Sequence, residues 1–343
     1  MKKLILCTTM LIGGCLLHAQ EKHRLKIQPL DIQDGAFKAY LRSIDQLETD
    51  GTQIYLRCRK EPRIVVIAED GTPIRQISGS GEGPGRLGNN GPVAMAVHGQ
   101  TVVILDYLNN KILRFQDGAY TNSFPFKSYQ KVFTSPAVNN FTFTDTALLI
   151  PNAPDAKGLA DRYDHQGRHL GQVGEMIRFP KDLTDKVGSM NDSQWVRDDK
   201  YIYCLRTFQP LITTYTLDLK KVSETEIKSR VAQAVWRQVQ EFVPEPGRPG
   251  IPFPVLTDAQ AFQGKLYAMI GGAIHEIDPR SGEVANLAFF YGEGPDFASV
   301  ETPTVSLMAF RILDNGKVIL AHPALLWNHD LWTVKLPFLN PRS

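Results

Sequence analysis

The chain contains little cysteine. Its 343 residues include four cysteines, and cleavage after Ala19 would leave only Cys58 and Cys204. Two cysteines cannot make the disulfide framework of a small secreted domain, and no Cys-x-x-Cys pair is present for a metal or redox site. The two cysteines occupy matching strands of the first and fourth repeats described below, on opposite sides of a ring. Their Cα atoms should therefore lie beyond the ~7 Å that a disulfide tolerates, and we expect two buried free thiols.

An excess of charge and a second long apolar run are also missing. After the first 19 residues, no stretch approaches the ~20 apolar residues that cross a bilayer, so we expect no transmembrane span. The chain has 38 Lys and Arg against 36 Asp and Glu, and Lys2 and Lys3 account for the difference. A protein that neutralises nucleic-acid phosphates needs a basic excess, so we expect no nucleic-acid partner.

The common catalytic signatures are absent from the sequence. It has no His-Glu-x-x-His zinc motif, no Gly-x-Ser-x-Gly nucleophile elbow and no Gly-Lys-Ser/Thr phosphate loop. No βαβ unit surrounds the Gly-rich run at 79–85, and a dinucleotide-binding loop requires that context. Its glycines are better explained by a backbone with positive φ between two structural units. We identify no catalytic residue, and an enzyme is the less favoured interpretation.

Residues 1–19 are typical of a secretory signal peptide, with a basic start and an apolar stretch too short to span a bilayer. Two processing routes are open. Leu17-His18-Ala19 resembles a signal-peptidase site, which would release a periplasmic or extracellular protein. Ile12-Gly13-Gly14-Cys15 resembles an imperfect lipobox, in which Cys15 would be lipidated. Either route takes the mature domain out of the cytoplasm.

A repeated pattern dominates the rest of the chain. Six times, an apolar strand is followed by a tight polar turn, a second strand, a polar loop and a third strand. The steps between turns are 48, 46, 54, 65 and 52 residues, measured at Gly51, Gly99, Asp145, Asp199, Gly264 and Gly316. A period of ~40–50 residues with about four strands is typical of a β-propeller blade. The sequence therefore predicts an all-β, six-bladed propeller with four-stranded antiparallel blades.

The predicted domain covers residues 20–343. Its sixth unit has three strands before the chain ends, so the N-terminal run at 24–29 is expected to supply the missing fourth strand and close the ring. The step of 65 residues marks an insertion at 229–255, in which Val231, Val235, Val239 and Phe242 have helical spacing. The expected blades span residues 43–78, 92–126, 141–174, 193–228, 256–291 and 304–338.

Loop length favours one rim of the predicted ring as the ligand-binding face. Tight turns lie on one rim, whereas the longer loops, the insertion at 229–255 and a smaller one at 171–194 crowd the other. The loops between the second and third strands supply candidate ligand-binding residues, which are Arg57, Arg59, Lys60, Asp106, Tyr107, Asn109, Asn152, Arg206, Phe208, His322 and Trp327. Each has a structural alternative: Asp106 and Asn109 can cap their own hairpin, the basic residues can form rim salt bridges, and the aromatic residues can pack.

Two motifs resemble a known family. Gly79-Ser-Gly81-Glu-Gly83-Pro84-Gly85 matches a Gly-rich loop of the six-bladed, TolB-like propellers exported by Bacteroidota, although Arg86 stands where an acid is usual. The stretch from Asp106 to Phe115 resembles an NHL-type repeat. The resemblance covers residues 24–338 and implies an exported or surface protein. It supplies no catalytic residue, because a shared fold does not establish a function.

These observations favour an exported, non-enzymatic binding or scaffolding protein. It would be a monomer without a cofactor, and it would present one rim to a peptide, a glycan or an envelope protein. The alternative is a propeller enzyme of the lactonase or lyase type, with a cation such as calcium held in the central channel by inner-strand ligands. Glu48 is one of the few such ligands that the sequence offers.

Overall fold

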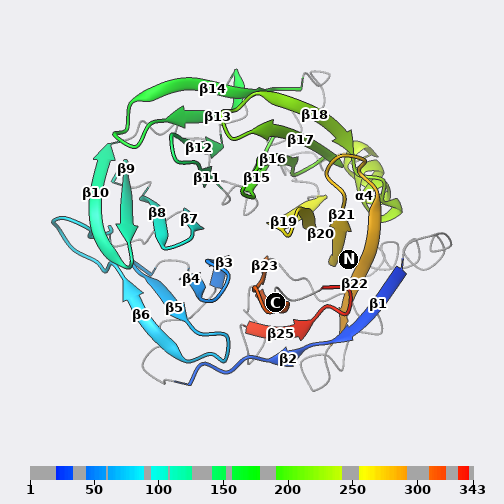
Figure 1. Cartoon of the computed structure of the whole chain (residues 1–343), viewed down its shortest axis with the longest axis horizontal. Helices are drawn as coiled ribbons and strands as arrows, with labels where there is room; N and C mark the ends of the chain where they lie inside the picture. Colours follow the sequence, from blue (N-terminus) through cyan, green and yellow to red (C-terminus); the bar gives the residue numbers. More distant parts are fainter. Residues whose placement is uncertain are drawn as a thin grey trace, which may run out of the picture.

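The computed structural model describes residues 21–33, 44–58, 61–88, 94–106, 109–125, 141–151, 157–177, 191–241, 255–291, 309–321 and 331–339. Six small sheets stand around a central axis, with the first strand of each sheet closest to the axis (Figure 1). Within each sheet the consecutive strands pair antiparallel, as in a propeller blade. The predicted six-bladed, all-β propeller is confirmed.

The blades follow one another along the chain. The strands are β3 (Ile44–Thr49), β4 (Ile54–Cys58), β5 (Ile64–Ile67) and β6 (Pro73–Ile77) in blade 1; β7 (Ala94–His98), β8 (Thr101–Asp106), β9 (Lys111–Gln116) and β10 (Ala119–Pro125) in blade 2; β11 (Thr142–Phe143), β12 (Leu148–Pro151), β13 (Gly158–Tyr163) and β14 (His169–Glu175) in blade 3; β15 (Ser193–Arg197), β16 (Tyr201–Arg206), β17 (Leu211–Thr216) and β18 (Lys221–Glu226) in blade 4; β19 (Leu256–Phe262), β20 (Lys265–Ile270), β21 (Ala273–Ile277) and β22 (Val284–Tyr291) in blade 5; and β23 (Ala309–Ile312), β24 (Lys317–Ala321) and β25 (Leu331–Lys335) in blade 6.

Apolar residues fill the spaces between blades. The described core divides into six clusters, and each cluster combines residues from two adjacent blades. The second strands are buried on both faces, which explains their continuous apolar runs such as that of β4. The outer strands alternate between exposed and half-buried residues, as in β18. Cys58 and Cys204 lie in the second strands β4 and β16, where both are buried and neither forms a disulfide, as predicted.

The N-terminal segment closes the ring and covers two sheet edges rather than one. The short strand β2 (Gln28–Pro29) pairs antiparallel with β25 and completes blade 6, as expected. The residues before it do not join that blade. Instead, β1 (Glu21–Lys26) pairs parallel with β22 and forms a fifth strand of blade 5 (Figure 1). Ile27 joins the two strands, and its side chain is buried in the core between blades 5 and 6.

The Gly-rich segment at 79–85 connects blades 1 and 2. Gly81, Gly83 and Gly85 all have positive φ, which confirms the role expected for these glycines. The segment folds back on itself, because Leu87 donates its N–H to the carbonyl oxygen of Gly79 at 3.0 Å. The side chain of Leu87 is fully buried in the core between blades 1 and 2, so the loop is anchored by packing.

The predicted amphipathic helix is present as α4 (Arg230–Glu241). Its buried side chains, Ala232 and Val239, pack on the core between blades 4 and 5. Ser229 precedes the helix, and its Oγ accepts the N–H of Ala232 at 3.4 Å, as an N-cap residue does. The same Oγ lies 3.0 Å from Nε2 of buried His275 on β21. Burial lowers the pKa of His275 to about 4, so this imidazole is neutral at neutral pH.

We predict that Ile27→Ala weakens ring closure. Ile27 is 2% exposed, and truncating a buried Ile to Ala typically costs ~2–5 kcal/mol through lost burial and the cavity that remains. The free energy of unfolding, measured by urea denaturation, should fall within that range. Arg24→Ala changes an exposed residue of β1 and serves as the control. Equal stabilities of the two variants would contradict the proposed contribution of this closure.

Candidate functional site

Polar side chains of the innermost strands connect neighbouring blades across the channel wall. Gln46 on β3 donates Nε2–H to the carbonyl oxygen of Met95 at 2.7 Å and accepts the Met95 N–H at 3.0 Å. Gln260 on β19 makes the same pair of bonds with Ile312 on β23, at 3.1 and 2.7 Å. The inner strands belong to separate sheets, so each amide side chain supplies hydrogen bonds that main-chain pairing does not.

Arg311 connects three blades through two carboxylates. Its Nη1 lies 2.7 Å from Oδ2 of Asp258 on β19, and its Nη2 lies 2.8 Å from Oε1 of Glu48 on β3. Its Nε also donates to Glu48, at 3.2 Å. Asp258 Oδ2 additionally accepts the N–H of Phe310, at 2.8 Å. One guanidinium on blade 6 thus binds the inner strands of blades 5 and 1 at the closure of the ring.

The pKa values of Glu48 and Arg311 are both raised above their ordinary values. Burial raises the pKa of Glu48 and Asp258 raises it further, and together these effects outweigh the lowering by Arg311. Burial lowers the pKa of Arg311, but the two carboxylates more than reverse this and hold its pKa above the ordinary value. The arginine is therefore charged at any physiological pH. The guanidinium compensates the charge of Glu48 only in part, because it also pairs with Asp258.

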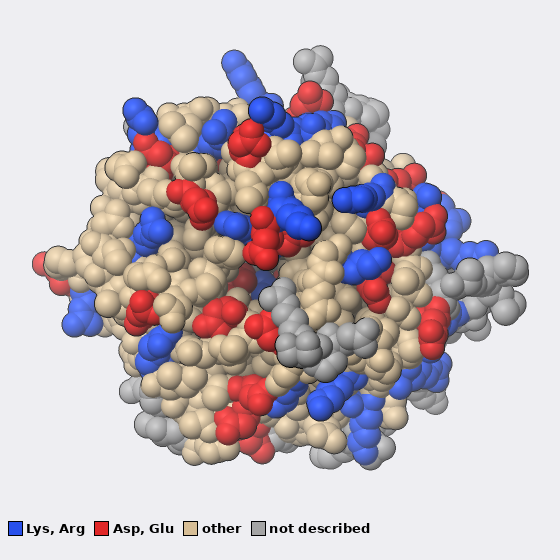
Figure 2. Space-filling model, in the orientation of Figure 1, with Lys and Arg blue, Asp and Glu red and all other residues tan. Residues whose placement is uncertain are grey.

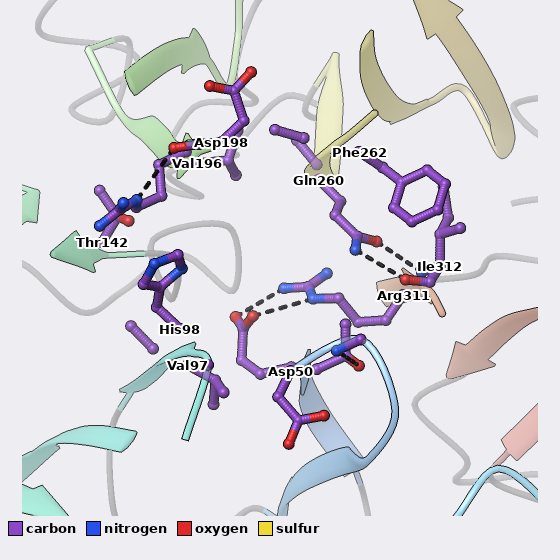
Figure 3. Close-up of a pocket in the computed structure, with 18 of the residues that line it drawn as sticks. Asp50, Val97, His98, Thr142, Val196, Asp198, Gln260, Phe262, Arg311 and Ile312 are labelled. Atoms are coloured by element: carbon purple, nitrogen blue, oxygen red, sulfur yellow. Dashed lines mark hydrogen bonds and ion pairs between the residues drawn. The ribbon is translucent and has the colours of Figure 1, made fainter. Parts of the chain in front are cut away.

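A cavity of about 290 Å³ lies above this ion pair, on the axis of the ring. All six inner strands line it, together with the tight turns after β3, β7, β15, β19 and β23. It therefore opens at the rim that carries the tight turns, which we call the turn rim. The polar residues that line it include Glu48, Asp50, His98, Arg197, Asp198, Asp199, Gln260, Gln263, Arg311 and Asp314. Figure 3 shows the His98 imidazole pointing into this space.

Two of the aspartates at the cavity mouth stabilise turns. Asp50 Oδ1 accepts the N–H groups of Thr52 and Gln53, at 2.9 and 2.8 Å, and its Oδ2 accepts the hydroxyl of Tyr55 at 3.0 Å. Asp198 repeats this arrangement in blade 4, where its Oδ2 accepts the hydroxyl of Tyr203 at 2.9 Å. The two turns therefore share one arrangement, in which the aspartate caps the turn and also binds the hydroxyl of the tyrosine five residues later. These two carboxylates are committed to the turn and less available to a ligand.

His98 and Arg197 form the opposite wall. Arg197 donates Nη1–H to the carbonyl oxygen of Phe143 at 3.0 Å and Nε–H to that of Asp198 at 3.3 Å, so it connects blade 4 to blade 3. Burial lowers the pKa of Arg197, and the acidic residues nearby partly oppose this effect. Burial and the nearby Arg197 also lower the pKa of His98. The imidazole is therefore neutral at neutral pH and can donate or accept a hydrogen bond.

Among the predicted site residues, Asp106 and Asn109 have structural contacts. Asp106 is fully buried, and its Oδ2 accepts Nδ2–H of Asn109 at 2.7 Å and the N–H of Gly88 at 3.1 Å. The carboxylate thus fixes both its own hairpin loop and the preceding connection between blades. This is the capping alternative that the sequence offered for the pair.

Three more predicted residues are buried in blades 1 and 4. Arg206 donates to Oδ1 of Asn191 at 3.1 Å and to the carbonyl oxygen of Glu175 at 2.6 Å. Phe208 is 1% exposed in the core between blades 4 and 5, and Arg57 is 4% exposed within β4. The structure does not bring these residues to the axial cavity. The other named residues lie outside the described ranges, namely Cys15, Arg59, Lys60, Tyr107, Asn152, His322 and Trp327.

The sequence analysis singled out Glu48 but missed Arg311 and Asp258. A positional signal exists: Gln46, Gln194 and Arg311 each lie five residues before the aligned residue of the first turn. Gln194 also connects blades, because its Nε2 donates to the carbonyl oxygen of Thr257 at 2.8 Å. Asp258 and Gln260 do not follow this spacing, because they lie six and four residues before the aligned turn residue Gly264.

Within the part of the chain that is described, no group of three or more His, Cys, Asp or Glu is arranged to hold a metal ion. Cys204 is a poor nucleophile, because burial raises the pKa of its thiol to about 11. No helix of the described residues is long and apolar enough to cross a membrane.

Comparison with known proteins supports the fold. No family model and no curated protein matches the sequence. A Bacteroides fragilis protein described as exported matches with a TM-score of 0.55 at 12% identity, over 92% of this chain and 98% of the other. Virginiamycin B lyase from Staphylococcus aureus gives a TM-score of 0.48 at 12% identity, over 92% and 89% of the two chains. BamB from Moraxella catarrhalis gives 0.42 at 12% identity, over 83% and 82%. At 12% identity, the TM-score of 0.55 with the Bacteroides fragilis protein indicates a shared fold and nothing finer.

We predict that Arg311→Met destabilises the protein by roughly 3–5 kcal/mol, because it leaves Glu48 and Asp258 buried without their shared cation. Urea denaturation would measure the loss. The triple variant Glu48→Gln/Asp258→Asn/Arg311→Met removes all three charges and should recover much of the stability. A single variant within about 1 kcal/mol of the parent protein would show that the ion pair contributes little.

A second prediction concerns Asp192, at the end of blade 4 opposite the cavity. It is 6% exposed, its Oδ2 has no hydrogen-bond partner among the described residues, and burial raises its pKa to about 8. The folded state therefore binds this proton more tightly than the unfolded state between about pH 4 and pH 8. Stability must fall as the pH rises through that window, on the order of 1 kcal/mol per pH unit.

Asp192→Asn should abolish this component of the pH dependence. Thermal or urea unfolding of both proteins at about pH 5 and about pH 8 would measure it. The variant should gain stability relative to the parent protein as the pH rises. A difference between the two proteins that stays constant with pH would contradict the shift.

Proposed function

We propose that the protein is an exported, non-enzymatic binding propeller that takes a small polar ligand, or a side chain of a peptide, glycan or envelope partner, into its axial cavity. The observation that carries the proposal is the cavity itself, which all six inner strands line. Many of its lining residues are polar or charged, and a few apolar side chains such as Val97 and Val196 lie between them, so the cavity suits a polar ligand. Its position on the axis lets every blade contribute to recognition.

The contacts inside the cavity favour binding over catalysis. The guanidinium of Arg311 is committed to Glu48 and Asp258, and the amide of Gln260 is committed to the main chain of Ile312. Among the described lining residues, no hydroxyl or thiol hydrogen-bonds to His98 or to a carboxylate, as an activated nucleophile would. A channel metal ion would need several carboxylates, but Asp258 is buried against Arg311, so of this pair only Glu48 lines the cavity.

Export is part of the proposal. The signal-like segment at 1–19 supports it, and the similar fold of a Bacteroides fragilis protein described as exported agrees with it. Release after Ala19 is the simpler route, with lipid attachment at Cys15 as the alternative. We further propose that the chain belongs to the TolB-like propellers, because its loop at 79–85 resembles their Gly-rich loop. We also propose that it is a monomer.

The proposal assigns the turn rim as the ligand face, whereas loop lengths favour the opposite rim. The described part of the insertion, α4, packs on the side of blades 4 and 5 and does not line the cavity. The remainder of the insertion, 242–254, lies outside the described residues. An experiment must therefore discriminate between the two rims.

We expect His98→Trp to block the cavity. Thermal unfolding of residues 20–343 would first be screened against peptides, glycans, calcium and EDTA, since a ligand at 100 times its Kd adds about 2.7 kcal/mol. His98→Trp fills the cavity with a larger ring. It should abolish the rise in unfolding temperature that any ligand found in the screen produces. Val222→Trp places the same ring on the exposed face of β18 and should leave the shift unchanged.

A third variant tests the other rim. Replacement of residues 243–254 by a short Gly-Ser linker should leave cavity binding intact. The contrary result is a ligand that still raises the unfolding temperature of His98→Trp but not that of the linker variant. That result would place the site on the rim opposite the turn rim and refute the proposal.

A further inference from the structure

We infer that the ligand of the axial cavity carries a protonated amine or guanidinium group, which the carboxylate of Glu48 binds. This inference rests on the proposed function, because it names the chemical class of ligand for the same site. It follows from three features of the described residues: the exposure of Glu48, the sharing of Arg311, and the charges at the cavity mouth.

Glu48 is the member of the ion pair that a ligand can reach. Its side chain is 16% exposed, whereas those of Arg311 and Asp258 are 3% and 4% exposed. The nitrogen atoms of Arg311 also point at carboxylates: Nε and Nη2 donate to Glu48, and Nη1 donates to Asp258. A negatively charged ligand would therefore meet the Glu48 carboxylate before it could bind the guanidinium.

The charge of Glu48 is only partly compensated. Two carboxylates share one guanidinium, and burial holds the pKa of Glu48 above its ordinary value despite hydrogen bonds from Arg311 and from Nε2 of Gln46. A buried carboxylate gains most from a nearby opposite charge that can also donate hydrogen bonds. A cation in the cavity would supply both, and neutral His98 offers a further polar contact for its N–H groups.

The cavity mouth favours the approach of a cation. Asp199 and Asp314 lie there in addition to the turn-capping Asp50 and Asp198. In the view along the axis, acidic side chains lie around a hollow near the centre (Figure 2). Arg197 is the opposing charge, but its guanidinium donates to two main-chain oxygens of the wall. A cleft lined mainly by one sign of charge raises the local concentration of the opposite sign.

The walls can accommodate an aliphatic chain behind the cationic group. Val97 and Val196 line the cavity on two sides (Figure 3). A Lys or Arg side chain, or a free alkyl amine, has this composition: an apolar stem and a charged end. Cadaverine, a five-carbon diamine, is therefore a suitable probe. Pentanediol has the same carbon chain with hydroxyl groups in place of both amines, and it is the neutral control.

The test measures binding of both probes to residues 20–343 by calorimetry and thermal unfolding, at neutral pH and fixed ionic strength. Cadaverine should bind and pentanediol should not. Glu48→Gln should weaken cadaverine at least tenfold. The variant should still fold, because Arg311 keeps Asp258 as its partner and the new amide oxygen can accept a hydrogen bond. Glu224→Gln makes the same change on outer strand β18, outside the cavity, and should leave binding unchanged.

The outcomes separate this inference from the proposed function. If Glu48→Gln leaves cadaverine binding unchanged, or if neither probe binds, the inference is wrong. If pentanediol binds, and His98→Trp blocks it while Glu48→Gln does not, the cavity is a binding site for a neutral ligand. The proposed function would then stand without a cationic ligand. If cadaverine binds equally well to His98→Trp, its site lies elsewhere and both ideas fail.

Discussion

The structure depends on how the inner strands of six separate sheets are held together around the axis. Main-chain hydrogen bonds end at the edge of each sheet, so neighbouring inner strands have only side chains with which to bond. Gln46, Gln194 and Gln260 use amide groups for this purpose, and Arg311 uses a guanidinium. The arginine stands where blade 6 meets blade 1, which is the junction between the two ends of the blade array. Apolar clusters between blades supply most of the burial, but they are less directional than these bonds.

The same constraint explains the position of the cavity. Polar side chains that connect adjacent strands must lie along the channel wall, and they fill part of it. Below the ion pair of Glu48 and Arg311, the wall residues are buried. Above it, the inner strands end in tight turns and the channel widens into the cavity. The turn aspartates Asp50 and Asp198 use their carboxylates to fix these turns, so rim geometry and mouth charge arise from the same residues.

Much of the fold could be predicted from the sequence, because its repeated unit is encoded locally. Turn residues such as Asp50-Gly51 and Asn315-Gly316 are local signals, and apolar runs between them indicate strands buried on both faces. The helix at Arg230–Glu241 was predictable for the same reason. The division of the N-terminal segment was not. Whether residues 21–26 pair with β22 or β25 depends on which sheet edges lie side by side in the closed ring, and local pattern does not contain that information.

The site was predictable only in part. Loop length directed attention to Asp106, Asn109 and Arg206, whose side chains bind their own loops and neighbouring segments. Arg311 looks like an ordinary charged residue in an apolar strand, and its partners lie 263 and 53 residues away along the chain. Its significance appears only when three blades meet.

A half-buried carboxylate whose pKa remains raised beside an arginine is a local departure from the otherwise consistent pattern of this fold. Such departures are found most often at functional sites, because packing alone would favour an apolar or fully paired group. In this chain the departure lies at the floor of the axial cavity, and Glu48 is the member of the ion pair that a ligand can reach.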